Sequence, residues 1–219
     1  MRIYILLLLL ISASFISAQQ SSFGFGAGAT ISWAERPNHS YYKNTAGKTF
    51  DGFYLFEKGK FITKATAGFC HKGFNQTVIF VDTSGNILGQ GDIERNRFSY
   101  LFISETAGVR YGDRFHGYTT AGVSLYYYLK TNVKLEETLL DNGYLYPGYN
   151  FDASNLKRLD FSLTAETAFF FKINDGNDIL LIVNYNHGIA GIRYRDVETS
   201  NPWKNHHLSI KIGLRKIIL

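Results

Sequence analysis

The residues of this chain that could carry out catalysis occur singly. His39, Ser40, Asp152 and Ser154 are of the types that an enzyme acting on lipid would use at its rim, and they fall in polar connecting segments. No serine or cysteine is visibly paired with a histidine for nucleophilic attack. We therefore predict no catalytic residue and no enzyme, and a lipid-modifying enzyme remains the alternative.

Metal and cofactor sites are likewise not indicated. His206 and His207 adjoin in a predicted strand, so they point to opposite faces and cannot jointly hold one metal ion. Gly24, Gly26 and Gly28 form a GxGxG pattern, but no helical pattern follows that could present its N-terminus to a phosphate. The acidic spacing of residues 174–178 lacks the remaining ligands of a calcium loop and indicates a turn.

The other side chains that could carry a chemical role are charged. They are spread over several segments in which apolar and polar residues alternate. The clearest is Arg158–Lys172, where Leu159, Phe161 and Leu163 begin an apolar parity that continues to Phe171. Such alternation is typical of a strand with different surroundings on its two faces. The charges assigned to the polar face of this and other segments are Lys64, Arg110, Asp160, Glu166, Lys172, Lys211 and Arg215.

The length of these segments indicates a membrane rather than a soluble sandwich. Globular strands are usually about 5–6 residues long, whereas a tilted membrane strand needs about 9–11. Eight such segments are predicted, joined by connections that alternate long and short: Ser22–Trp33, Thr49–Glu57, Phe61–Phe74, Phe98–Tyr111, Tyr118–Thr131, Arg158–Lys172, Ile179–Gly188 and His206–Ile217. We predict an all-β fold, an eight-stranded antiparallel up-and-down transmembrane barrel with both chain ends on the short-turn, periplasmic side.

Two features leave alternatives open. In the fourth segment Glu105 shares the apolar parity, so either a bulge resets the register or Glu105 lies near an interface. In the long connection between residues 75 and 96, a turn signal at 83–86 flanked by apolar residues predicts a hairpin that extends beyond the membrane.

Composition agrees with an exported membrane protein. The chain has 219 residues, with 18 Phe and 15 Tyr that would supply aromatic girdles at the two membrane interfaces. The formal charge of +5 comes from scattered basic residues, which argues against nucleic acid as a partner, and the single cysteine, Cys70, excludes an internal disulfide. Residues 1–18 have the pattern of a signal peptide, with Arg2 before an apolar run, so residues 19–219 would form the barrel domain.

Three patches of the sequence are similar to Bacteroidota porin-family outer-membrane β-barrel proteins. They are Gly52-Phe53-Tyr54-Leu55 through Lys60-Phe61 to His71-Lys72-Gly73, then Tyr100-Leu101 through Val109-Arg110-Tyr111 to Ala121-Gly122, and finally the sixth to eighth predicted strands, which end in Gly213-Leu214-Arg215. The resemblance implies an outer-membrane barrel, and the family includes PorT-like proteins associated with secretion. The chain departs from the family in ending with Leu219 in place of the frequent terminal aromatic residue.

For function, we expect a structural or surface-binding role and not an open porin. An eight-stranded barrel is just wide enough for its own side chains to fill, and opposite charges inside it should pair. The expected partners are outer-membrane lipids and an extracellular ligand or protein, with the barrel a monomer and no cofactor; an accessory component of a secretion system is a further alternative. The candidate partner-binding residues lie in the longest connection and are Tyr144, Tyr146, Tyr149 and Phe151.

Overall fold

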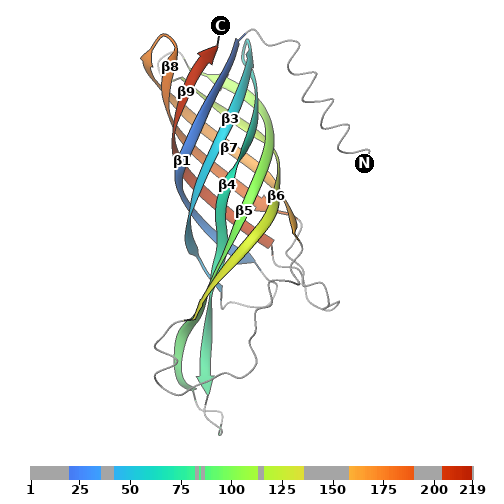
Figure 1. Cartoon of the computed structure of the whole chain (residues 1–219), viewed down its shortest axis with the longest axis vertical. Helices are drawn as coiled ribbons and strands as arrows, with labels where there is room; N and C mark the ends of the chain where they lie inside the picture. The colour runs from blue at the N-terminus through green and yellow to red at the C-terminus, as the bar shows by residue number, and fades with distance from the viewer. Residues whose placement is uncertain are drawn as a thin grey trace, which may run out of the picture.

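The computed structural model of the chain is a closed antiparallel β-barrel (Figure 1). It describes residues 20–35, 42–81, 84, 87–112, 116–135, 158–189 and 204–218. Within these ranges there is no helix long and apolar enough to cross a membrane. The predicted fold class is confirmed: eight strands form the wall, and each pairs antiparallel with its neighbours.

The strands follow the predicted order and are longer than predicted at most ends. Their bounds are β1 Gln20–Glu35, β3 Thr45–Lys58, β4 Phe61–Val81, β5 Ile87–Tyr111, β6 His116–Leu135, β7 Leu159–Asn174, β8 Asn177–Gly188 and β9 Lys204–Ile218. A short segment, β2 (Tyr42–Lys43), adds to the edge of β4. The order around the wall is β4-β3-β1-β9-β8-β7-β6-β5, and pairing of β5 with β4 closes it.

The predicted hairpin between the third and fourth segments is present as an extension of β4 and β5. Residues Asn75–Val81 pair with the first part of β5, and β6 continues alongside as far as Leu135. In Figure 1 this extension projects below the barrel, on the side away from the C-terminus. A part of the sheet therefore stands clear of the wall on the side of the long connections.

The short connections are on the opposite side, and local turn chemistry explains the first of them. The chain reverses from β3 to β4 at Lys58-Gly59-Lys60, where Gly59 has a φ of 61°. Side chains with a Cβ rarely adopt this left-handed conformation, whereas glycine does so without a steric penalty. This turn fixes the register Lys58↔Phe61, and with it the faces of both strands.

The alternation in sequence becomes an outward apolar face and an inward polar face. In β7, Phe161, Leu163 and Phe171 are exposed on the outer wall, while Asp160 and Glu166 are buried in the interior. The exposed apolar side chains are on every strand of the wall, which is the surface that lipid tails would cover. The lipid-facing parity predicted for this segment is thus the outer wall of the barrel.

The glycines of β1 face the crowded interior. A Cβ placed on Gly24 would lie 2.4 Å from the ring of Phe53, and one on Gly26 would lie 3.1 Å from Oδ1 of Asp51. Glycine at these positions lets bulky and charged side chains of β3 pass across β1. The GxGxG pattern therefore serves the packing of the interior.

The structure decides against the first alternative raised for Glu105, a bulge that resets the register. The pairing of β5 with β6 does shift register between Ser99 and Tyr100, but the extra residue is Leu129 of β6, and the alternation of β5 itself continues through this point in its pairing with β4. From Leu101 onward the parity is regular, and Glu105 lies on the outer face between Ala65 of β4 and Val123 of β6. Glu105 is thus a carboxyl group on the lipid-facing wall, in the middle of an otherwise apolar row.

Replacing Glu105 with leucine should therefore stabilise the barrel. Acidic side chains on the lipid face are unfavourable, though less so than Lys or Arg, so we expect a gain of about 1 kcal/mol in the free energy of unfolding. Urea unfolding from lipid vesicles measures this quantity, and Glu105→Gln is expected to give a smaller gain. A loss of stability in Glu105→Leu would contradict the assignment of Glu105 to bare lipid.

Candidate functional site: the charged interior of the barrel

The interior of the barrel holds an unusual number of ionised side chains for a space so narrow. Among the described residues, five acids are buried inside the wall, and four buried bases together with half-buried Arg110 accompany them. The acids are Asp51, Glu57, Asp160, Glu166 and Asp178, and the buried bases are Lys64, Lys72, Lys211 and Arg215. An isolated buried charge is strongly unfavourable, so the arrangement of these groups decides whether the interior is stable.

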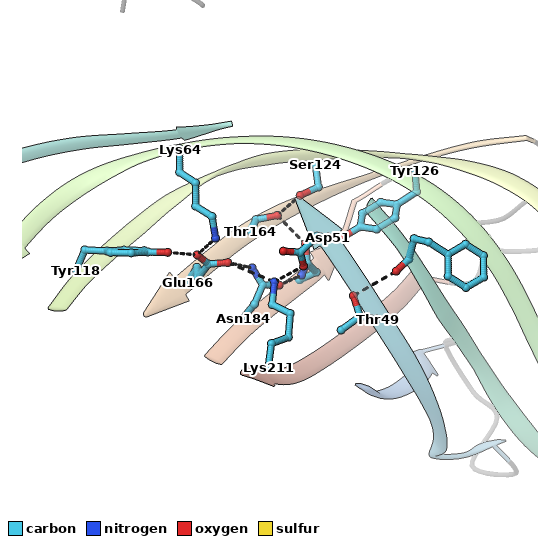
Figure 2. A network of polar contacts seen from close by, with 12 residues as sticks. Thr49, Asp51, Lys64, Tyr118, Ser124, Tyr126, Thr164, Glu166, Asn184 and Lys211 are labelled. Carbon is cyan, nitrogen blue, oxygen red and sulfur yellow. Dashed lines mark hydrogen bonds and ion pairs between the residues drawn. The ribbon is translucent and has the colours of Figure 1, made fainter. Parts of the chain in front are cut away.

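Glu166 of β7 is the centre of the middle cluster (Figure 2). Its Oε1 accepts hydrogen bonds from Nζ of Lys64 and, at 2.7 Å, from the hydroxyl of Tyr118. Its Oε2 accepts a hydrogen bond from Nδ2 of Asn184 at 3.2 Å and lies 3.7 Å from Nζ of Lys211. Both oxygens of the carboxylate are therefore satisfied by groups from four other strands.

Lys211 of β9 extends the middle cluster to β3. Its Nζ donates to Oδ2 of Asp51 at 2.6 Å, so Lys211 bridges two acids as Glu166 bridges two bases. Lys64 also lies over the ring of Phe53, with Nζ 4.6 Å from the ring centroid. Two acids and two bases thus form one neutral network across the barrel (Figure 2).

A second cluster lies nearer the short turns and is organised by Arg215 of β9. Nε and Nη2 of Arg215 donate to Oδ2 of Asp178 at 3.0 and 2.7 Å, and Nη1 donates to Oε1 of Glu57 at 2.5 Å. The other oxygen of Glu57 accepts a hydrogen bond from Nη1 of Arg110 at 2.8 Å. The guanidinium also stacks on Phe170, 4.0 Å from the ring centroid. The planar fork of arginine suits this double contact better than an ammonium would.

A third, smaller group lies toward the long connections. Nζ of Lys72 donates to Oδ2 of Asp160 at 3.4 Å and sits over the ring of Tyr126, 3.0 Å from its centroid. The hydroxyl of Tyr126 in turn donates to Oδ1 of Asn186 at 2.7 Å, which also accepts a hydrogen bond from Thr164. Polar side chains thus continue the network from the middle cluster to the outer end.

Apolar and aromatic side chains fill the barrel around these charges. Toward the short turns they form one cluster: Phe53, Leu55, Ile62, Tyr118, Ala168, Phe170, Leu180 and Ile182. Toward the long connections they form another: Ala34, Cys70, Phe74, Phe98, Tyr100, Tyr126 and Tyr128. The pocket between them, lined by groups such as Thr66, Ser104 and Ser209, has room for about one water molecule. These side chains occupy the cross-section that a channel would need.

The structure brings most of the predicted interior charges together. Lys64, Asp160, Glu166, Lys211 and Arg215 are buried inside the barrel, and Arg110 is half-buried beside Glu57. The list drawn from the sequence omitted Lys72, which had the inward parity, and the acids Asp51, Glu57 and Asp178. Asp178 was assigned to a turn, but β8 begins one residue before it.

Lys172 was predicted to lie in the barrel interior, and this prediction is wrong. Its side chain is 65% exposed and its Nζ lies 2.6 Å from Oδ1 of Asp175 in the β7–β8 turn. The cause is local, since the pairing of β7 with β8 shifts register between Lys172 and Asn174, where the wall ends. The hydrogen bond from Lys172 lowers the pKa of the Asp175 carboxyl below its ordinary value. This is a solvated surface pair.

Several candidates from the sequence lie outside the described residues. These are the aromatic loop residues Tyr144, Tyr146, Tyr149 and Phe151, and the polar residues His39, Ser40, Asp152 and Ser154. The described residues contain no group of three or more His, Cys, Asp or Glu side chains placed to hold a metal ion. His207 faces the interior next to Tyr126, whereas His206 faces outward, as their adjacent positions in a strand predict.

A closed eight-stranded wall with an apolar outside and a charged inside defines the protein as an outer-membrane β-barrel. The chain is similar in structure to the outer membrane protein OprG from Pseudomonas aeruginosa, with a TM-score of 0.50 at 13% identity over 92% of this chain and 97% of OprG. Neisserial surface protein A gives a TM-score of 0.49 at 12% identity, with 89% of this chain and 96% of that chain covered. No protein-family model and no curated protein sequence matches the chain.

Proposed function

We propose that this protein is a small outer-membrane barrel with a side-chain-filled interior, which acts through its surfaces and does not conduct as an open porin. The observation that carries this proposal is the interior itself. Its ionised groups are bound to one another across the barrel, and aromatic clusters lie on both sides of them. A barrel without a passage can support the membrane or bind partners, and both roles depend on its outer surfaces.

The orientation of the barrel in the membrane follows from the same proposal. Residues 1–18 would direct export and be removed, and residues 19–219 would insert as the barrel. Outer-membrane barrels have short periplasmic turns and longer outer loops. The short turns and the C-terminus would therefore face the periplasm, and the β4–β5 extension would project from the cell (Figure 1).

The projecting sheet favours a surface-binding role over a purely structural one. β4 and β5 remain paired from the wall out to Val81 and Ile87, and β6 pairs with β5 as far as Glu94↔Leu135. Membrane anchoring alone needs strands of only about 9–11 residues, whereas β5 has 25. The resemblance to Bacteroidota porin-family barrels agrees with the fold, and we retain it as part of the proposal.

Purified protein in planar lipid bilayers is expected to show no large, steady conductance. Among the described residues, paired charges and two aromatic clusters fill the interior that a channel of porin size would need. A general porin added to the same bilayer afterwards provides the positive control for detection. A steady wild-type channel of porin size would overturn the filled-interior proposal.

Deleting residues 144–151 is expected to abolish adhesion or partner capture and to leave folding intact. This loop carries Tyr144, Tyr146, Tyr149 and Phe151, and aromatic side chains dominate binding energetics at protein surfaces. Pull-down of surface ligands with the intact and deleted proteins measures capture, and heat-modifiable gel mobility measures folding. Equal capture by both proteins would move the binding role to another part of the surface, such as the β4–β5 extension.

A further inference from the structure

A row of polar and basic side chains crosses the outer face of the wall, at the end of the barrel nearest the long connections. His71 of β4 lies opposite Ser99 of β5, and Ser99 lies opposite Lys130 of β6. The register of β3 against β4 places Lys48 of β3 beside His71. We refer to Lys48, His71, Ser99 and Lys130 as the basic row. Two lysines and an imidazole therefore share one face of four adjacent strands.

A bulge in β6 turns Lys130 outward. Tyr126 and Tyr128 are buried in the interior, so an uninterrupted strand would place Lys130 on the same side. The pairing of β6 with β5 passes over Leu129, and both Leu129 and Lys130 are exposed. Bulges are frequent where a side chain is re-aimed beside a functional site. This bulge brings an ammonium group to the outer wall at the level of His71.

The basic row carries positive charge that the described side chains do not neutralise. Lys48 and Lys130 are exposed and form no ion pair within the described part of the chain. Together with Arg97, they lie close enough to act electrostatically on the imidazole of His71. Of the acids whose side chains the structure describes, Glu105 is the one on the outer wall, six positions along β5 from the basic row and thus about 20 Å away. A positive field of this kind attracts anions.

An apolar row lies next to the basic row, one step closer to the middle of the wall. It consists of Phe50, Phe69, Leu101 and Tyr127, which pair with one another across the same four strands. Phe69 contacts His71 edge-on, with ring centroids 4.9 Å apart, and Phe50 and Leu101 are 56% and 49% exposed. Two residues along a strand span about 7 Å. A molecule lying along the wall would therefore meet cations at one end and apolar surface directly beside them.

We propose that the basic row and the apolar row together bind a phosphorylated lipid, with its phosphate on Lys48, His71 and Lys130 and its acyl chains on the apolar row. Lysine binds phosphate as a flexible point charge, and imidazole can donate a further hydrogen bond. An uncharged lipid would leave the cations without an anion, and a soluble phosphate would leave the apolar row uncovered. Basic side chains at the membrane boundary recognise lipid headgroups in this way. The inference rests on the proposed function for its leaflet, since the proposed orientation places both rows in the outer one.

Native mass spectrometry of the detergent-solubilised protein, titrated with three related ligands, tests this assignment. Dioleoyl phosphatidic acid carries a phosphate and acyl chains, dioleoylglycerol carries the same chains alone, and glycerol 3-phosphate carries the phosphate alone. We expect saturable binding of one phosphatidic acid per protein, and binding at least about tenfold weaker for the other two, because each of them meets one row only. Equal affinity for dioleoylglycerol would overturn the role of the phosphate. Equal affinity for glycerol 3-phosphate would overturn the assignment to a lipid.

Variants of the two lysines locate the site. Lys48→Gln combined with Lys130→Gln is expected to weaken phosphatidic acid about thirtyfold, since each basic residue near an anionic lipid surface contributes a factor of about five. Lys60→Gln combined with Lys216→Gln removes the same charge from exposed lysines at the short-turn end, so it is the matched control and should bind as the parent does.

The outcomes of this comparison are distinct. Unchanged affinity in the folded Lys48 and Lys130 double variant, or an equal loss in the control, would overturn the proposal and leave attraction to net charge as the explanation. Heat-modifiable mobility confirms that each variant is folded, and if the double variant fails to fold, Lys130→Gln decides with an expected loss of about fivefold. A conducting barrel would overturn the filled interior without affecting this result, because the two rows lie on the outer wall.

Discussion

Glu166→Ala is expected to destabilise the barrel by about 3–5 kcal/mol, the cost of removing one partner from a buried ion pair. The substitution leaves the ammonium of Lys64 inside the wall without the carboxylate that it contacts. It also removes the acceptor of Tyr118 and Asn184, so two more buried donors lose their partner. Urea unfolding from lipid vesicles, and loss of the heat-modifiable gel band at lower temperature, measure the effect.

A matched control distinguishes the buried pair from a charge at the rim. Lys172→Ala removes one member of the exposed Lys172–Asp175 pair on the same strand, and it should leave unfolding unchanged because solvent screens such pairs. The double variant Lys64→Met with Glu166→Leu removes both charges together. It should lose less stability than the sum of the two single variants, since Lys211 keeps its ion pair with Asp51 and neither Lys64 nor Glu166 is left charged without the other. A Glu166→Ala protein as heat-resistant as its parent would contradict the role of the middle cluster.

The faces of these residues could be predicted from the sequence, and their partners could not. Side chains alternate with a period of two, so the parity of β7 placed Asp160 and Glu166 inside. Which base meets Glu166 depends on the register of strands about a hundred residues apart, since Lys64 and Glu166 are separated by 102 positions. Local pattern carries no information on that register, which follows from all the turns around the barrel taken together.

The buried acids that the sequence pattern did not predict, such as Asp51, show a second limit of prediction from alternation. On the inward face of β3, Asp51 is followed by Phe53 and Leu55, because the apolar cluster near the short turns lies inside the barrel. The inward-facing residues of this strand are therefore as apolar as the outward-facing ones. For this reason the alternation of apolar and polar residues could not identify Asp51 as an interior charge. The prediction that Lys172 lies in the interior was wrong for the opposite reason. Lys172 has the inward parity, but the wall ends before its side chain reaches the interior.

The contact between two histidines on the outer wall could not be predicted from the sequence for the same reason, because it depends on strand register. The sequence correctly separates His206 and His207 onto opposite faces, yet it gives no sign that His187 lies beside His206. That contact depends on the pairing of β8 with β9 across a long connection of the chain. Sites that combine residues from two strands become visible only when the register is known.

Arg215 gives the second large expected effect, because among the described residues it is the one base that forms ion pairs with both Glu57 and Asp178. In the described part of the chain, Arg215→Leu would leave these two buried carboxylates with one ion-pair partner, Arg110, which contacts Glu57. We expect a loss of about 3–5 kcal/mol in the free energy of unfolding, as for other buried pairs that lose one partner. Acidic pH should partly restore the variant, since protonation of the orphaned carboxylates removes their charge.

Arg215→Lys tests whether charge alone explains this cluster. A lysine ammonium carries the same charge but lacks the planar fork that reaches Asp178 through Nε and Nη2 while Nη1 binds Glu57. The ammonium also cannot stack on Phe170 as a flat guanidinium does. Arg215→Lys should therefore be intermediate between the parent and Arg215→Leu in urea unfolding, while Lys216→Leu, next in sequence but exposed on the outer wall, should not be destabilised. Full stability in Arg215→Lys would show that any cation suffices, and that the geometry of the fork adds nothing to the closure of this end of the barrel.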